Sequence, residues 1–365
     1  MAFNPLAFFT KRAVGIDIGT FSIKIVELSR LGDKKKLENY GELSSSAISK
    51  SPFRSFERKA LLLSTREISQ TIKPIIEEAK IKTKKVVLSI PDFSTFYTAF
   101  DLPPMTEEEL PAAVQFTARR YIPIPLSEVT LDWRIIEGEV SSKEKTKLKI
   151  LLVAIPKKII NQYKEIAVLS GLDLFALDAE VFGLVKALPK KTEKLICLID
   201  IGDQSTTISI VEEGILKMSY SFDISGEKFT KQIAETLSIG YNEARELKEK
   251  YGLRWDSEKN VAQILYPMID FILIKIGEIF RPIYQEEKKE ISKIVLAGGS
   301  AKLPYLKEYF SEQLDSIFPE RKLKTEVEII NPFYGLSFPL ILSETLKEMG
   351  PDFAIAAGMA IKGVE

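Results

Sequence analysis

The sequence contains no histidine and a single cysteine, Cys197. The missing imidazole excludes serine–histidine triads, histidine metal sites and histidine general bases. Any catalysis must therefore use carboxylates, lysines, hydroxyls, backbone amides or a bound metal. One cysteine excludes an intrachain disulfide framework and is typical of a reducing compartment. Because Cys197 lies in an apolar run, we expect a buried strand residue there.

Long apolar runs and a net charge are also missing. No apolar stretch reaches the roughly 18 residues of a membrane-spanning helix, so we predict no transmembrane span. Lys and Arg together number 51, as do Asp and Glu, so the chain has no net positive charge that would favour binding to nucleic acid. A chain of 365 residues is long for one core, which indicates two lobes of roughly 150–200 residues each. Residues 1–12 are predicted to form an N-terminal arm. Two alternatives stay open for it: a packed or disordered segment, or a segment that binds weakly to a membrane surface.

A short motif occurs twice, as Asp17-Ile18-Gly19-Thr20-Phe21-Ser22 and as Asp200-Ile201-Gly202-Asp203-Gln204-Ser205. Each copy follows an apolar run and precedes another, which predicts a strand, a tight turn and a second strand. Glycine permits a close backbone approach, and successive turn amides with a hydroxyl can cradle an anion. Two such hairpins facing across a cleft would grip a phosphate chain from both sides.

Alternating strand-like and helix-like segments predict an α/β architecture. The Ala297-Gly298-Gly299-Ser300 segment continues this alternation as a strand, a glycine turn and a helix start. Residues 189–194 are the predicted linker between the lobes. The predicted parts are the first-lobe core (13–89 and 171–193), an inserted α+β subdomain (90–170), the second-lobe core (194–225 and 291–365) and a helical subdomain of the second lobe (226–290).

Several charged residues are candidates for chemistry, and each has a structural alternative. Asp17 and Asp200 could hold Mg²⁺ or its waters, or serve as buried structural carboxylates. Lys24 could reach the phosphates, or be an exposed strand lysine. Glu180 could polarise a water, although the helix dipole also favours Glu at a helix N-terminus. Glu246 and the nearby Lys248 could contact one side of a bound nucleoside, or they could form part of a solvated helix face.

Together these residues resemble the actin-like ATPase superfamily, whose members have two related lobes with nucleotide between them. Residues 14–20 look like its first phosphate loop, residues 198–202 like its second, and residues 296–300 like its adenosine loop. The resemblance implies the actin-like ATPase fold, with ATP and Mg²⁺ in the cleft. Asp17 and Asp200 are then the metal-site candidates, and Asp200 and Glu180 the catalytic ones. The implied nucleotide contacts are Gly19, Thr20, Phe21, Ser22, Lys24, Gly202, Gln204, Ser205, Gly226, Glu246, Lys248, Gly298, Gly299, Ser300 and Lys302.

Within that superfamily the chain is most similar to the PilM family of type IV pilus assembly. Residues 24–28, 102–105, 121–123, 331–333 and 357–363 carry this likeness. It implies a cytoplasmic protein that is recruited to the inner face of the inner membrane. The first implied partner is the N-terminal peptide of a PilN-like inner-membrane protein, which would dock between the first lobe and its insertion. The others are further platform and motor components of the pilus machine and further copies of the chain.

Three positions depart from the family pattern and predict weak or absent ATP hydrolysis. Asp203 adds negative charge to the second phosphate loop, Ser225-Gly226 replaces a common Gly-Gly pair, and Arg245 replaces a Glu that often meets the ribose. Two other functions stay open: an FtsA-like filament-forming protein of cell division and a small-molecule kinase of the same fold.

Overall fold

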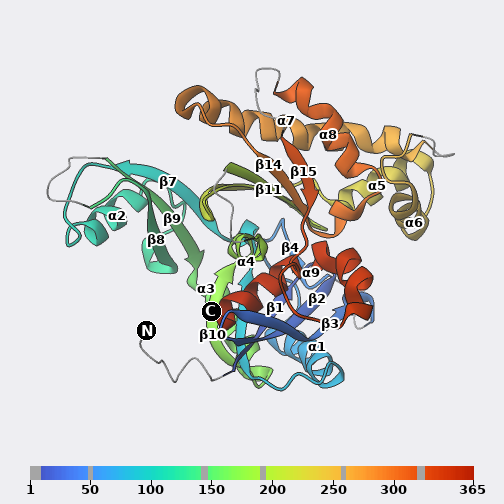
Figure 1. Cartoon of the computed structure of the whole chain (residues 1–365), viewed down its shortest axis with the longest axis horizontal. Helices are drawn as coiled ribbons and strands as arrows, with labels where there is room; N and C mark the ends of the chain where they lie inside the picture. The colour runs from blue at the N-terminus through green and yellow to red at the C-terminus, as the bar shows by residue number, and fades with distance from the viewer. Residues whose placement is uncertain (1–9, 48–51, 141–146, 190–194, 256–259, 319–324) are drawn as a thin grey trace.

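The structure is a computed structural model of the whole chain, and it describes residues 10–47, 52–140, 147–189, 195–255, 260–318 and 325–365. Residues 190–194 of the predicted linker (189–194) and most of the predicted N-terminal arm lie outside these residues. Two five-stranded sheets lie one above the other in Figure 1, and the helices α4 and α9 lie between them. No helix in the described ranges is long and apolar enough to cross a bilayer.

The first sheet has the strand order β10-β6-β1-β2-β3. Strands β1 to β3 form an antiparallel meander, and β6 and β10 then add in parallel with β1. Helices α1 and α3 cover one face, where Ile72 and Tyr163 belong to the same buried cluster as Ile16. The bounds are β1 (Lys11–Ile18), β2 (Ser22–Leu31), β3 (Lys34–Ser44), α1 (Thr65–Glu78), β6 (Lys85–Ile90), α3 (Lys157–Leu169) and β10 (Asp173–Ala179).

A small subdomain projects from the first lobe, at the left of Figure 1. Its sheet has the order β7-β9-β8, and α2 packs on that sheet through Leu110 and Val114. The predicted boundaries, 90–170, were too wide, because α3 packs against α1 in the first-lobe core. The bounds are β7 (Phe96–Leu102), α2 (Leu110–Ala118), β8 (Val129–Glu137) and β9 (Leu148–Pro156).

The second sheet repeats the first, with the order β13-β12-β11-β14-β15. Here too an antiparallel meander is followed by strands that add in parallel. Helix α7 buries an apolar face with Leu265, Ile269 and Ile276 in the cluster that contains Ile199. The bounds are β11 (Leu195–Ile201), β12 (Thr206–Glu212), β13 (Ile215–Phe222), α5 (Gly226–Leu237), α6 (Tyr241–Tyr251), α7 (Val261–Glu287), β14 (Lys293–Ala297), α8 (Leu306–Ile317) and β15 (Glu326–Ile329).

Helix α9 (Ser343–Val364) does not belong to the second lobe, where the predicted range 291–365 had placed it. Its small residues pack on the first sheet, since Ala356 and Ala360 cluster with Ala13 and Val26. A side chain on Gly358 would collide with the backbone of Gly183, which shows how closely α9 approaches α4 (Glu180–Ala187). Helices α4 and α9 therefore form the central layer between the sheets (Figure 1).

Candidate functional site

The two Asp-Ile-Gly turns have the same backbone geometry. In the first, the amide of Gly19 donates to the carbonyl of Ser22 at 2.9 Å, and in the second the amide of Gly202 donates to Ser205 at 2.9 Å. The first turn connects β1 to β2 and the second connects β11 to β12, and the two strand pairs have equivalent register next to the turn. Both sheets therefore present a polar turn at the end of a buried strand, as the repeated motif predicts.

Lys24 lies behind the first turn, and its ammonium donates to the Ser22 hydroxyl at 2.8 Å. Burial lowers the pKa of Lys24, but the carboxylates of Asp17, Glu42, Asp352 and Asp203 outweigh it and raise the pKa above its ordinary value. Because Asp203 belongs to the second lobe, the ammonium of Lys24 interacts electrostatically with carboxylates of both lobes. Lys24 is thus a mostly buried cation, not an exposed strand lysine.

Asp17 and Asp200 occupy matching positions at the ends of β1 and β11. The hydroxyl of Ser89 donates to Asp17 Oδ1 at 2.7 Å. Burial first, then the carboxylates of Glu180 and Asp17, raise the pKa of Asp200 to about 7. A divalent cation would relieve this repulsion. In the described part of the chain no three carboxylates converge as a metal cage, so the donors suit Mg²⁺ that keeps waters and phosphate oxygens as its other ligands.

Glu180 begins α4 and is buried in an ion pair. Arg54 Nη1 donates to Glu180 Oε1, and the amide of Asp92 donates to Glu180 Oε2 at 3.1 Å. Burial raises the pKa of Glu180, and the Arg54 guanidinium opposes that rise. Sequence reasoning missed Arg54 and Asp92, because both are distant from Glu180 in the chain and neither lies in a recognisable motif.

The second turn connects to α5 and to the first lobe. Gly226, the first residue of α5, donates its amide to the carbonyl of Gly202 at 2.9 Å. The side chain of Gln204 accepts from the amide of Phe56 at 2.9 Å and donates to Glu227 at 3.2 Å. Gln204 therefore joins the two lobes, a contact that the sequence alone did not indicate.

The diglycine turn lies against Asp200. Gly298 has φ +81°, and a Cβ there would lie 2.4 Å from Asp200 Oδ1. Ser300 is buried in the short helical turn that follows. Lys302 forms an ion pair with Asp352 on α9, a residue that sequence reasoning had not identified. The turn is thereby packed between the second sheet and the central layer.

On α6, Lys248 and Glu246 have different surroundings. Lys248 is buried and donates to the carbonyl of Gly226 at 2.9 Å, and burial lowers its pKa. The negative charge of Asp203 opposes that shift. The hydrogen bond to Glu249 is the main cause that raises the pKa of Arg245, and Asp203 adds to it. Glu246 is exposed, and no hydrogen bond or ion pair links it to another residue in the described ranges.

A pocket of about 230 Å³ lies between the insertion, the first lobe and β13. Strands β7 and β13 are edge strands of their sheets and both contribute to its wall. Edge strands offer unpaired backbone groups to an extended chain. Its lining residues, largely aromatic or hydroxylic, are Phe56, Lys59, Asp92, Phe93, Thr95, Phe96, Tyr97, Thr98, Tyr121, Ile122, Ser219, Tyr220 and Ser221. We call this pocket the insertion groove.

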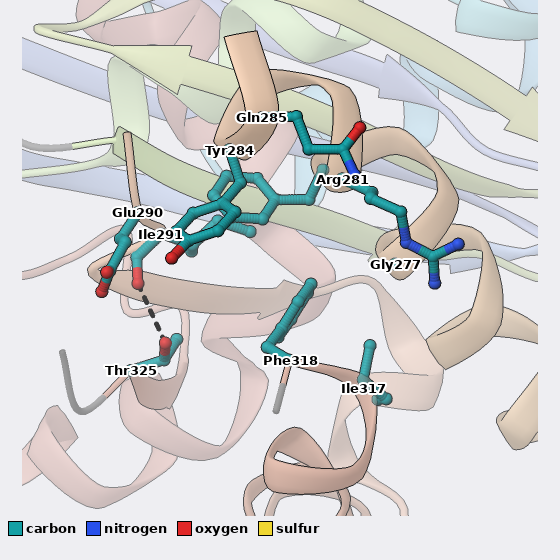
Figure 2. Close-up of a pocket in the computed structure, with 10 residues that line it drawn as sticks. Gly277, Arg281, Tyr284, Gln285, Glu290, Ile291, Ile317, Phe318 and Thr325 are labelled. Atoms are coloured by element: carbon teal, nitrogen blue, oxygen red, sulfur yellow. Dashed lines mark hydrogen bonds between the residues drawn. The ribbon is translucent and has the colours of Figure 1, made fainter. Parts of the chain in front are cut away.

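A second cavity of about 230 Å³ lies in the second lobe, at the C-terminal end of α7. The ring of Phe318 meets that of Phe280 edge-on at 5.4 Å between centroids, and Figure 2 shows Arg281 extending away from Tyr284. The hydroxyl of Thr325 closes one side by donating to the carbonyl of Ile291 at 2.9 Å. Both polar turns of the candidate site lie outside its lining, so it is separate from that site.

Comparisons with known proteins give the family and the fold. Residues 15–364 match the family described as type IV pilus assembly protein PilM. Cell division protein FtsA of Staphylococcus epidermidis strain RP62A is 23% identical over 343 residues, which cover 82% of this chain and 72% of FtsA. FtsA of Enterococcus faecalis is 22% identical over 335 residues, covering 80% and 74% respectively.

Among solved structures, a PilM–PilN type IV pilus biogenesis complex matches with a TM-score of 0.81 and 23% identity, covering 97% of this chain and 98% of that one. The ethanolamine utilization protein EutJ from Carboxydothermus hydrogenoformans has a TM-score of 0.54 at 14% identity, covering 98% and 91%. MreB5 of Spiroplasma citri bound to AMPPNP has a TM-score of 0.51 at 13% identity, covering 95% and 94%. These likenesses confirm the predicted actin-like ATPase fold.

Proposed function

Because the chain belongs to the PilM family of type IV pilus assembly proteins, we propose that it is an ATP-binding scaffold of a pilus machine that docks a PilN-like peptide. The match to this family over residues 15–364 is the observation that carries the proposal. The pilus role follows from the family. The nucleotide, the peptide and their sites are the parts that the site geometry supports.

The paired turns support ATP binding. Backbone amides around Gly19 and Gly202, with the hydroxyls of Ser22 and Ser205, would hold the phosphates, and Lys24 would neutralise part of their charge. Asp17 and Asp200 would hold Mg²⁺. The adenosine would lie between the Gly298-Gly299 turn and α6, with Ser300, Lys302 and Lys248 around it. A structural neighbour of the same fold was solved with AMPPNP.

Weak hydrolysis is consistent with the surroundings of Glu180. Both of its carboxylate oxygens already accept a hydrogen bond, one of them from the guanidinium of Arg54. A carboxylate whose two oxygens already accept hydrogen bonds is less available to take a proton from an attacking water. In addition, Asp203 places a negative charge in the second turn. The nucleotide would then act mainly by holding the lobes together.

The insertion groove suits an extended peptide. It lies between the edge strands β7 and β13, so a peptide could add main-chain hydrogen bonds and place alternate side chains against aromatic walls. The related solved complex contains PilN. Docking to an inner-membrane partner would recruit this chain to the cytoplasmic face of that membrane. Further platform and motor components would join through the same assembly.

A calorimetric titration tests the peptide proposal. The probe is a synthetic peptide from the N-terminus of the membrane protein encoded beside this chain, added in the presence of ATP and Mg²⁺. Tyr121 lines the groove and stacks on Phe100 at 5.5 Å, so Tyr121→Ala should weaken binding at least tenfold. Tyr334→Ala is the matched control, because Tyr334 is 76% exposed outside the groove. Failure of the folded wild type to bind the peptide would refute the proposal.

A second function, filament formation, is favoured by the likeness to FtsA over about four fifths of the chain. Sedimentation and electron microscopy with ATP and Mg²⁺ separate the two functions. Filaments without peptide binding would favour the FtsA-like function, whereas peptide binding without filaments favours the scaffold.

A further inference from the structure

One short stretch of chain, residues 53–61, lies between the nucleotide-site turns and the insertion groove. It contains β4 (Arg54–Ser55) and β5 (Ala60–Leu61), and we call it the β4–β5 hairpin. The amide of Phe53 donates to the carbonyl of Thr20 in the first turn at 2.7 Å. The amide of Phe56 donates to the Gln204 side chain in the second turn at 2.9 Å. The hairpin is therefore bonded to both turns.

The same hairpin forms part of the groove wall. Phe56 and Lys59 line the groove, and the ring of Phe56 meets that of Phe93 edge-on at 5.6 Å between centroids. The ammonium of Lys59 lies 5.9 Å from the centroid of Phe96. Any movement of the hairpin with the turns would thus displace side chains that a bound peptide would contact.

A chain of four hydrogen-bonded residues, one link of which is a backbone amide, leads to the same wall. Arg54 pairs with Glu180, Glu180 accepts from the amide of Asp92, and the hydroxyl of Tyr97 donates to Asp92 Oδ1. Arg54 and Asp92 are at least nine-tenths buried. Arg54 Nε and Asp92 Oδ2 have no hydrogen-bond partner among the described residues, so each of these two residues keeps a polar atom that could form a further hydrogen bond. Asp92 and Tyr97 also line the groove.

Resting on the proposed function, we propose that Arg54 is a positioning residue through which the nucleotide site and the insertion groove are coupled. Nucleotide held by both turns fixes the ends of the β4–β5 hairpin and keeps the lobes together. The groove needs the lobes together, because Ser219, Tyr220 and Ser221 of the second lobe form one of its walls. Lys217 on the same strand also donates to the carbonyl of Ile136 in the insertion at 2.9 Å.

The expected coupling is positive. ATP should tighten peptide binding at least about fivefold, the lower end of typical allosteric couplings, and linkage requires the peptide to tighten ATP binding by the same factor. Calorimetry with the full chain measures both factors. The titrations are the peptide with and without saturating ATP and Mg²⁺, and ATP with and without saturating peptide.

Two variants test the assignment to this polar chain. Tyr97→Phe keeps the aromatic wall but removes the hydroxyl that contacts Asp92, so the coupling factor should fall to about one to two. Arg54→Lys keeps a cation beside Glu180 and should retain part of the coupling. Tyr334→Phe is the matched control with the same chemical change outside both sites, and it should couple as the wild type does.

Three results would overturn the proposal. Equal peptide affinities with and without ATP, when both ligands bind, would show that the sites are independent. Full coupling in both Tyr97→Phe and Arg54→Lys would remove the role of this polar chain. Absence of ATP or peptide binding in the wild type would refute the proposed function itself, and the coupling with it.

Discussion

Replacing Gly298 by alanine is expected to damage both stability and ATP binding. Gly298 has φ +81° and ψ 169°, a backbone conformation that is essentially restricted to glycine. The new Cβ would also lie 2.4 Å from Asp200 Oδ1 and 2.6 Å from the carbonyl oxygen of Ile201. The Ile201 oxygen belongs to the backbone at the end of β11 and cannot turn aside, whereas the Asp200 carboxylate would have to leave its position in the site.

The two effects set the size of the loss. The backbone strain costs about 1–3 kcal/mol, and forcing a methyl group into an occupied position costs about 1–3 kcal/mol more. The free energy of unfolding should therefore fall by about 2–6 kcal/mol. Gly171→Ala is the matched control, since Gly171 has φ +73° but nothing lies within 4 Å of the position that its new methyl group would take. It should show the conformational cost without the collision.

Urea unfolding followed by circular dichroism measures the stability of both variants, and calorimetry measures their ATP affinity. We expect Gly298→Ala to be the less stable of the two and to bind ATP at least tenfold more weakly than Gly171→Ala does. Equal destabilisation of the two variants, or wild-type ATP affinity in a folded Gly298→Ala protein, would refute the reasoning from the close approach to Asp200.

Three further predictions concern charged residues of the candidate site. Because the fold raises the pKa of Asp200 to about 7, the free energy of unfolding should fall as the pH rises from about 4 to 7, by at most about 1.4 kcal/mol per pH unit. In urea unfolding without Mg²⁺, Asp200→Asn should flatten that slope. A slope unchanged by Asp200→Asn would contradict this. Arg54→Met should lower the free energy of unfolding by about 3–5 kcal/mol, because it leaves the buried Glu180 unpaired. The double variant Arg54→Met/Glu180→Met should recover most of that loss. Equal losses in the single and the double variant would show that Arg54 and Glu180 do not stabilise each other. Asp203→Asn should tighten ATP binding by about 1 kcal/mol by removing a negative charge near the phosphates, whereas weaker binding by calorimetry would mean that Asp203 itself contacts the nucleotide.

The sequence was most informative where local pattern and tertiary structure agree. The repeated Asp-Ile-Gly turns are predictable because strand periodicity and turn chemistry act over a few residues, and the structure gives both turns the same hydrogen bond. The long apolar helix α7, Val261–Glu287, lies within the range 226–290 that was predicted to be helical. In each case the necessary information lies within one segment.

Long-range pairings could not be predicted in the same way. Helix α9 was assigned to the second lobe, yet its alanines and glycines pack closely on the first sheet. Likewise, Arg54 is separated from Glu180 by 126 positions, and Gln204 from Phe56 by 148. Such partners are determined by how the sheets and layers assemble, which local propensity does not encode.

The most direct test of the account is a calorimetric titration of ATP with Mg²⁺ into the full chain. The wild type should bind one nucleotide, and Lys24→Ala should bind at least tenfold more weakly, because Lys24 is the buried cation behind the first turn. Lys275→Ala, which removes a lysine ion-paired with Glu278 on the distant face of α7, should bind as the wild type does. Absence of saturable binding to the folded wild type, or equal affinities for the wild type and Lys24→Ala, would contradict the nucleotide cleft.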